Sequence, residues 1–237
     1  MALERHLQRM ASSARDLYGA ELPPQLREDA VAACAGVTLG RERIDVRFDA
    51  EGEAEWEAVA TPIDAGEFFP PWERGAALCS VEAPRWSGAH KLADRDWLEA
   101  KEAELGDAVP LLIGADGAVL EAGRANVFAL FDGALATPPL DGRILPGTAR
   151  AAVREIAREE GVETREQPIH VADVYTAEET FLTNSIRGIE PAIALDDTPL
   201  PGCGPVSRRL ADALRRRWGL PARKAAADVQ KQSQLSH

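Results

Sequence analysis

Two Asp-Gly pairs, Asp116-Gly117 and Asp132-Gly133, constrain the fold of this 237-residue chain more than any other feature. Each pair lies between two short apolar runs with strand character, and this arrangement predicts a β-hairpin because Asp-Gly suits the backbone of a tight turn. Two consecutive antiparallel hairpins are therefore expected. Their four strands are predicted at Val109 to Ile113, Ala118 to Glu121, Asn126 to Phe131 and Ala134 to Thr137.

Helical periodicity appears on both sides of these hairpins. Apolar residues spaced by three and four predict an amphipathic helix from Leu3 to Tyr18. Pro146-Gly147 opens another helix, which Gly161 ends. Further helices are predicted at 25–35, 94–105 and 205–218. Further strands are predicted at 44–48, 54–60, 76–81, 163–169, 179–183 and 189–195.

This order of elements predicts an α+β protein with two domains. The turn-forming run Ala83 to Gly88 is the expected boundary between them. Residues 1–84 would form a small N-terminal α/β domain and residues 85–220 a large C-terminal domain. Residues 221–237 lack apolar periodicity and are expected to be a flexible tail.

Charge and composition exclude several classes of partner. The formal net charge is −12, which argues against nucleic acid and anionic membranes as partners. No apolar run approaches the roughly 18 residues of a membrane span, and the charged N-terminus does not resemble a signal peptide. The three cysteines and four histidines show no disulfide framework and no metal-ligand spacing. A cytoplasmic protein without a metal is expected.

Three features could together serve a pyridoxal phosphate enzyme. The amine of Lys91 can condense with the cofactor aldehyde. The carboxylate of Glu121 can hold a proton on the ring nitrogen, so that the ring accepts electrons. The helix start after Pro146-Gly147 offers backbone N–H groups to the phosphate. Each feature also has a plain alternative: a surface lysine, a glutamate that faces solvent, and an ordinary helix entry.

Five segments, taken in order, resemble the fold-type IV pyridoxal phosphate enzymes, the class IV aminotransferase family. This family includes branched-chain and D-amino acid aminotransferases and 4-amino-4-deoxychorismate lyases. The resemblance covers residues 1 to about 218. The matching segments are His6 to Ala14, His90 to Arg95, Glu121 to Phe128, Leu145 to Arg150 and Phe181 to Pro191.

The resemblance implies a role for each matching residue. Lys91 would be the catalytic lysine that carries the cofactor and acts as general base, and Glu121 would pair with the pyridine nitrogen. Arg9, Ser185 and the backbone amides of Gly147, Thr148 and Ala149 would bind the phosphate, and Leu145 would pack on the ring. Asn126 belongs to the motif that contains Glu121 and is also expected at the cofactor. Asn184 and Arg187 are expected to face the substrate.

Within the family, the chain most resembles the lyases. The spacing from His90-Lys91 to Arg95 and the run Thr183-Asn184-Ser185 are similar to theirs. The expected function is conversion of 4-amino-4-deoxychorismate to 4-aminobenzoate and pyruvate, a step of folate biosynthesis. An aminotransferase for branched-chain or D-amino acids is the first alternative.

The chain departs from the family pattern in two ways. Ala149 stands where the aminotransferases usually have a threonine, so that its phosphate contact could only be through the backbone. The chain also begins almost at the arginine helix, where family members have additional strands of the small domain. The small domain is therefore expected to be truncated at its N-terminus. The further alternative is an inactive remnant with a structural role. The resemblance also implies a homodimer and a small-molecule amine substrate.

Overall fold

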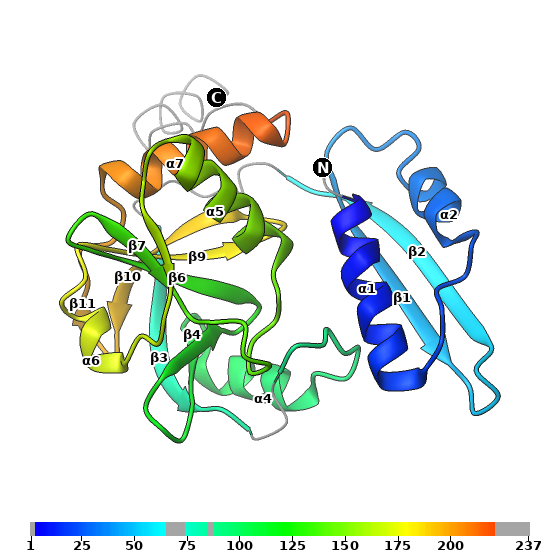
Figure 1. The fold of residues 1–237 in the computed structure, drawn as a ribbon, viewed down its shortest axis with the longest axis horizontal. Coiled ribbons are helices and arrows are strands. Elements are labelled where there is room, and N and C mark those ends of the chain that lie inside the picture. The colour runs from blue at the N-terminus through cyan, green and yellow to red at the C-terminus, as the bar shows by residue number, and fades with distance from the viewer. Residues whose placement is uncertain (1–2, 65–73, 85–87, 221–237) are drawn as a thin grey trace, which may run out of the picture. The chain divides into compact units, whose positions relative to one another are not determined.

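The computed structural model describes residues 3–64, 74–84 and 88–220 (Figure 1). These residues form two compact units. The smaller unit comprises the described residues within Ala2–Pro70 and His90–Asp94, and the larger unit those within Pro71–Ala89 and Arg95–His237. Within the described ranges, every helix is too short or too polar to cross a bilayer.

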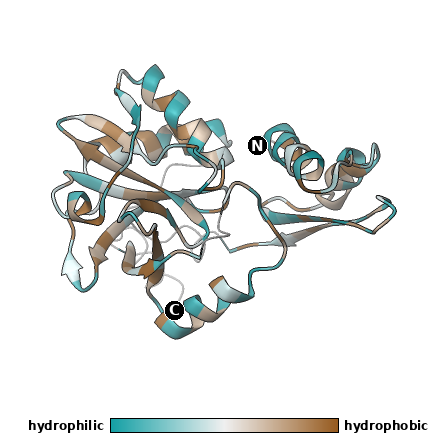
Figure 2. Ribbon diagram, turned by 60° about the horizontal axis from the view of Figure 1, so that its bottom comes forward, coloured by the Kyte–Doolittle hydropathy of each residue, from teal (hydrophilic) through white to brown (hydrophobic). Residues whose placement is uncertain are grey.

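The smaller unit is a two-stranded antiparallel sheet with two helices. Strands β1 (Gly40–Phe48) and β2 (Ala54–Pro62) pair along their full length. Helices α1 (Leu3–Tyr18) and α2 (Leu26–Ala33) lie on one face of this hairpin (Figure 2). The ring of Tyr18 packs on Phe48, with the centroids 5.1 Å apart. The sequence-based expectation of two helices followed by a hairpin is thus confirmed.

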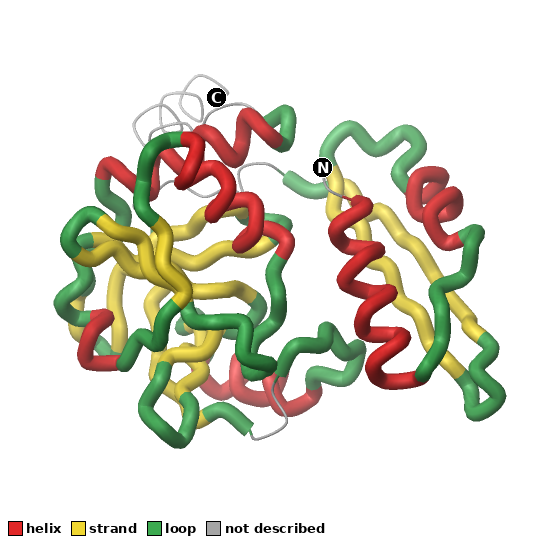
Figure 3. Tube along the Cα trace, viewed as in Figure 1, coloured by secondary structure: helices red, strands yellow, loops and turns green. Residues whose placement is uncertain are grey.

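The larger unit is built on one mixed sheet that has nine strands among the described residues (Figure 3). Its strands are β3 (Ala76–Glu82), β4 (Val109–Ile113), β5 (Val119–Ala122), β6 (Ala125–Phe131), β7 (Ala134–Thr137), β8 (Thr164–Glu166), β9 (Glu179–Asn184), β10 (Gly188–Leu195) and β11 (Thr198–Pro199). Its helices are α4 (Asp96–Leu105), α5 (Thr148–Glu159), α6 (Val171–Val174) and α7 (Pro205–Arg217).

Six of these strands close on themselves. The path runs β3, β4, β5, β6, β9, β10 and returns to β3, because β9 pairs with both β6 and β10. The pairs β3–β4 and β3–β10 are parallel, whereas the other pairs on the path are antiparallel. A closed path leaves no open edge among the six strands, so their backbone groups pair within the barrel.

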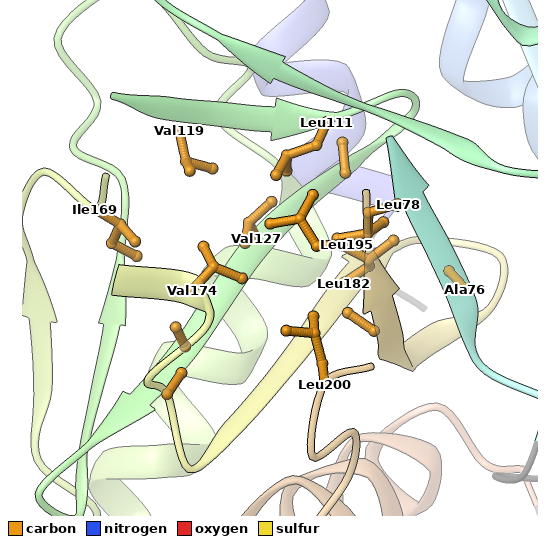
Figure 4. Close-up of a cluster of buried hydrophobic side chains, with 14 of the residues drawn as sticks. Ala76, Leu78, Leu111, Val119, Val127, Ile169, Val174, Leu182, Leu195 and Leu200 are labelled. Atoms are coloured by element: carbon orange, nitrogen blue, oxygen red, sulfur yellow. The ribbon is translucent and has the colours of Figure 1, made fainter. Parts of the chain in front are cut away.

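Side-chain alternation along these strands makes two cores. Val127 and Ala129 on β6, with Leu182 on β9, belong to the cluster drawn in Figure 4. The intervening Phe128 and Phe181 stack with centroids 5.2 Å apart in a second cluster, which includes residues of α5 and α7. A strand turns successive side chains to opposite faces, so one strand serves both cores.

Most predicted elements are present, and three details differ. Asp132 and Gly133 both have positive φ, as the predicted two-residue hairpin turn requires, but the first hairpin turns over the longer segment Gly114–Ala118. The predicted strand 163–169 is confined to Thr164–Glu166, because Pro168 lacks the N–H that pairing needs. The four-residue helix α6 was not predicted because it is too short to show a period.

The division of the chain differs from the expected boundary at residue 84. Strand β3 pairs with β4 and β10, so residues well before 84 belong to the larger unit. Residues His90–Asp94 group instead with the smaller unit. Residues 85–87 of the expected linker and the expected tail, 221–237, lie outside the described residues.

A buried carboxylate from β9 lies at the N-terminus of α7. Glu179 is 4% exposed and accepts hydrogen bonds from the backbone N–H groups of Val206 and Ser207, at 3.0 and 2.7 Å, and from the Ser207 hydroxyl. The helix starts at Pro205 after Gly204, neither of which offers a capping side chain. A Cβ at Gly204 would overlap the Glu179 carboxylate. Strand β9 therefore supplies the cap for α7.

We predict that Glu179→Gln lowers the free energy of unfolding by about 3 kcal/mol, because buried N–H donors lose a charged acceptor. Urea denaturation measures this change. The matched control is Glu178→Gln at the exposed neighbour, where a change below about 0.5 kcal/mol is expected. Equal effects of the two substitutions would contradict the capping role.

Candidate active site

The hairpin β5–β6 presents Glu121 and Asn126 side by side. The two residues are direct partners in the antiparallel register, so their side chains leave the same face of the sheet. Both then contact the backbone of Leu145. The N–H of Leu145 donates to Glu121 Oε2 at 3.2 Å, and Asn126 Nδ2 donates to the Leu145 carbonyl at 2.9 Å. The loop before α5 is therefore fixed to the hairpin through one residue.

Gly147 is required where this loop meets α5. It is the N-cap residue of the helix, and a Cβ there would overlap Asn126 Oδ1. A glycine also offers no side chain to accept from the N–H groups of the first turn. The start of α5 thus combines a close backbone approach with the positive end of the helix dipole.

Two hydroxyl groups meet at this helix start. Thr148 Oγ1 and Ser185 Oγ lie 2.9 Å apart, and Ser185 comes from the turn between β9 and β10. Ala149 is 3% exposed and contributes only a methyl group. Hydroxyls beside a helix N-terminus are suited to an oxyanion such as a phosphate. From the sequence, Thr148 was expected to contribute only its backbone N–H, and the contact of its hydroxyl was not predicted.

Arg150 is the largest fully buried side chain in this region, at 2% exposure. Its guanidinium donates to the carbonyl of Pro138 and to Glu166 Oε1, both at 2.9 Å. Burial lowers the pKa of Arg150, and the Glu166 carboxylate opposes this shift. A cation in the first turn opposes the helix dipole. A cation at this position indicates that Arg150 has acceptors outside the helix. Its contacts with Pro138 and Glu166 hold the first turn of α5 to the end of β7 and to β8.

The expected substrate residues take part in the turn after β9. Asn184 Oδ1 accepts from the backbone N–H groups of Ile186 and Arg187, at 2.9 and 2.8 Å. Arg187 Nη1 lies 2.8 Å from Glu190 Oε1, and its side chain is 44% exposed. The nearby Thr183 hydroxyl is buried and has no hydrogen-bond partner among the described residues. Roles for Asn184 and Arg187 at a substrate stay predictions.

Arg9 and Lys91 both belong to the smaller unit. Arg9 shares one face of α1 with His6 and Ser13, which stand three residues before it and four after it. His90 Nδ1 and Ser13 Oγ share a hydrogen bond of 3.0 Å, which ties the residue before Lys91 to α1. The pKa of His6 is lowered to about 4 by burial first and then by the positive charges of Arg9 and Lys91. His6 and Ser13 lie in the matching segment His6 to Ala14, but no role was predicted for either from the sequence.

The two units thus contain different parts of the expected site. Lys91 and Arg9 lie in the smaller unit, and the larger unit contains the others. Within the larger unit, the structure brings together the acid, the loop and the helix start. These residues are Glu121, Asn126, Leu145, Gly147, Thr148, Ala149 and Ser185.

Comparison with known proteins decides the family. The sequence model described as Amino-transferase class IV matches residues 1–195. The chain belongs to this family. The expected recognition, a fold-type IV pyridoxal phosphate enzyme, is confirmed, and so is the expected α+β fold.

Curated relatives of this member of the class IV family are branched-chain-amino-acid aminotransferases. The protein of Salmonella typhimurium is 28% identical over 200 residues, which are 83% of this chain and 59% of the relative. The protein of Escherichia coli K12 is 30% identical over 160 residues, which are 67% of this chain and 50% of the relative. The chain therefore spans between half and three fifths of the length of these relatives.

Two solved structures are also similar. The 4-amino-4-deoxychorismate lyase of Pseudomonas aeruginosa superposes with a TM-score of 0.78 and 28% identity, covering 90% of this chain and 84% of the lyase. A hypothetical aminotransferase of Mycobacterium tuberculosis in its PLP-bound form gives 0.73 and 25%, covering 90% and 82%.

The donor set at the start of α5 fits the phosphate of the family's cofactor. The close approach at Gly147 leaves the first turn without a capping side chain. The paired hydroxyls of Thr148 and Ser185 add donors that can turn toward an oxyanion. The class IV chain thus keeps a hydroxyl at this turn although Ala149 replaces the usual threonine.

We predict that Gly147→Ala lowers the melting temperature by several degrees and weakens phosphate binding. The added Cβ must displace Asn126 Oδ1, which strains the loop that contains Leu145. Differential scanning fluorimetry and isothermal titration with inorganic phosphate measure the two effects. The control is Ala152→Gly, a substitution later in α5, which tests for a general loss of stability. Gly142→Ala is not used as a control, because φ is positive at Gly142 and alanine would be strained there. Unchanged phosphate affinity in Gly147→Ala would contradict the fit.

We further predict that stability falls as the pH drops from about 6.5 to about 4. In that window an unfolded histidine takes up a proton, whereas folded His6, with its pKa lowered to about 4, stays neutral. Unfolding therefore binds a proton, and the free energy of unfolding rises with pH. The free energy of unfolding is measured by urea denaturation across this pH range, without added cofactor. Its slope against pH should be smaller in His6→Gln than in His170→Asn. Equal slopes in the two variants would contradict the assignment.

Proposed function

We propose that this chain is a pyridoxal phosphate-dependent lyase that converts 4-amino-4-deoxychorismate to 4-aminobenzoate and pyruvate. Support comes from the similarity to the solved lyase, at 28% identity over 90% of this chain. It also comes from the Asn184-Ser185 pair, which stands where branched-chain enzymes usually have Gly-Thr. The observation that carries the proposal is the contact of Glu121 with the Leu145 N–H, which holds a carboxylate beside the phosphate-binding helix start.

The resemblance to the family assigns cofactor binding to residues that lie far apart in the chain. Arg9, Ser185 and the start of α5 would neutralise and bind the phosphate, and Leu145 would support one face of the ring. Asn126 acts through the Leu145 carbonyl, which it holds at 2.9 Å. The proposed cofactor residues are Arg9, Lys91, Glu121, Asn126, Leu145, Gly147, Thr148, Ala149 and Ser185.

Bound pyridoxal phosphate supplies an electron sink next to the substrate amine. Glu121 keeps a proton at the ring nitrogen, because a carboxylate stabilises the charged form of its partner. The Lys91 amine removes the proton from the substrate carbon that bears the amino group. The adjacent C–O bond then breaks, the ring becomes aromatic, and the released enolpyruvate takes up a proton to become pyruvate. Aromatisation makes the reaction favourable without any oxidant or acceptor.

Asn184 and Arg187 are proposed to orient the substrate carboxylates. Arg187 pairs with Glu190, whose side chain is 7% exposed. Glu190 thereby keeps the guanidinium at the end of the β9–β10 turn, close in sequence to Ser185. A homodimer and a cytoplasmic location stay predictions.

The second candidate is an aminotransferase for branched-chain or D-amino acids. The curated relatives favour the branched-chain activity. The same Lys91 amine would then return the proton to the cofactor carbon, and the amino group would pass to a keto acid acceptor. The two functions share the proposed cofactor residues and differ in the need for that acceptor.

We predict that Lys91→Ala removes both the yellow colour and the activity. Turnover should fall by on the order of 10³-fold or more, because one side chain provides both the covalent link and the general base. The readouts are the visible spectrum and borohydride trapping on the purified protein. Lys101→Ala, which removes a half-buried lysine paired with Glu104, is the control and should retain both. A trappable band that survives in Lys91→Ala would refute the assignment of Lys91.

Substrate supply separates the two candidate functions. 4-Amino-4-deoxychorismate without a keto acid should give fluorescent 4-aminobenzoate and pyruvate in equal amounts. Pyruvate would appear at the same rate when 2-oxoglutarate is added. If the yellow protein forms no aminobenzoate but transaminates leucine, the aminotransferase is correct. A colourless protein that stays colourless with added cofactor would overturn both.

A further inference from the structure

Arg95 is a member of the lysine motif that the proposed function does not use. It lies four residues after Lys91 and is the N-cap residue of α4, where its carbonyl accepts from the N–H of Glu99 at 2.8 Å. Its side chain is half-buried. A half-buried cation at a helix N-terminus opposes the helix dipole, so neighbouring carboxylates must stabilise it.

Arg124 clamps α4 to the hairpin that presents Glu121. It lies in the turn between β5 and β6, two residues before Asn126. Its Nε donates to Glu102 Oε1 at 3.0 Å, and its Nη2 donates to Glu102 Oε2 at 2.9 Å and to Glu99 Oε1 at 3.2 Å. Two carboxylates of α4 thus bind the guanidinium of Arg124, which connects the helix to the β5–β6 turn.

Glu99 and Glu102 lie three residues apart and share one face of α4, and Arg95 is the N-cap residue four positions before Glu99. The contacts of Arg124 turn this acidic face toward the hairpin and hold the start of the helix, where Arg95 lies, near the β5–β6 turn. Burial lowers the pKa of Arg95, and the charge of Arg124 lowers it further. The carboxylate of Glu121 gives the largest opposing effect, ahead of those of Glu102 and Glu99. Glu121 is thus close enough for its charge to act on Arg95.

We propose that Arg95 is a positioning residue and counter-ion for Glu121, which Arg124 and the acidic face of α4 hold in place. Arg95 keeps the Glu121 carboxylate ionised before the cofactor arrives, while the Leu145 N–H fixes one of its oxygens. The acid is then ready as an anion for the ring nitrogen. This inference rests on the proposed role of Glu121 and adds a residue that sets its charge.

Charge balance supports this division of roles. The cluster holds two guanidinium groups, Arg95 and Arg124, and three carboxylates, Glu99, Glu102 and Glu121. Arg124 pairs with both Glu99 and Glu102 and balances one of their two negative charges. Arg95 is the other cation of the cluster, and its charge faces Glu121 together with the part of the helix charge that Arg124 does not balance. Removal of Arg95 would leave Glu121 with a net negative surrounding, which favours its protonated form.

The test measures the titration of Glu121 in the protein without cofactor, by carboxyl carbon NMR with assignment from Glu121→Gln. In Arg95→Gln the midpoint for Glu121 should rise by on the order of one pH unit, because an opposite charge is lost. Arg95→Lys, which keeps the charge, should restore most of the original midpoint. The control Arg165→Gln removes a cation that pairs with Glu163 at the surface and should leave the Glu121 midpoint unchanged.

If Arg95→Gln does not fold, the reverse experiment serves. The guanidinium Nε–H signal of Arg95 should shift in Glu121→Gln and stay in place in Glu163→Gln. An unchanged Glu121 midpoint in folded Arg95→Gln, or an unchanged Arg95 signal in Glu121→Gln, overturns the inference. Neither readout needs cofactor or turnover. Failure here is therefore distinct from failure of the proposed function, which borohydride trapping at Lys91 reports.

Discussion

The backbone of Leu145, held on both sides by Glu121 and Asn126, is the contact on which the site in the larger unit depends. One pairing in the β5–β6 register places Glu121 next to Asn126. Their side chains then hydrogen-bond to the N–H and the carbonyl of Leu145. These bonds position the loop and the start of α5, where the close approach of Asn126 admits only glycine at position 147. Acid, ring support and anion-binding helix start are thereby set by a single hairpin.

Local features of the fold could be predicted from the sequence, whereas its closure could not. Asp132-Gly133 specified a turn, and the spacing in residues 3–18 specified a helix, because both depend on neighbouring residues alone. The barrel depends on β9 pairing with β6 and on β3 lying beside β10, which no local pattern encodes. The expected boundary at residue 84 differs from the division into compact units for the same reason, because the local sequence of β3 does not distinguish it from the strands before it.

The candidate site divides in the same way. Lys91, Glu121 and Gly147 could be proposed from residue type and order, because the chemistry needs an amine, an acid and a helix start. The hydroxyl contact between Thr148 and Ser185 joins residues far apart in the chain and needed the structure. Arg150 and Arg95 could have been suspected from their positions at helix starts, where a cation requires a nearby acceptor.

The parallel pairing of β3 with β10 has a consequence for synthesis on the ribosome. Leu78 leaves the ribosome early, but its barrel partner Leu195 is made only after every other strand of the closed path. Until then a nascent chain exposes one edge of β3 and the apolar lining that Leu78 belongs to. The larger unit therefore has to complete its folding late, and this interval is when a chaperone would have the most to protect.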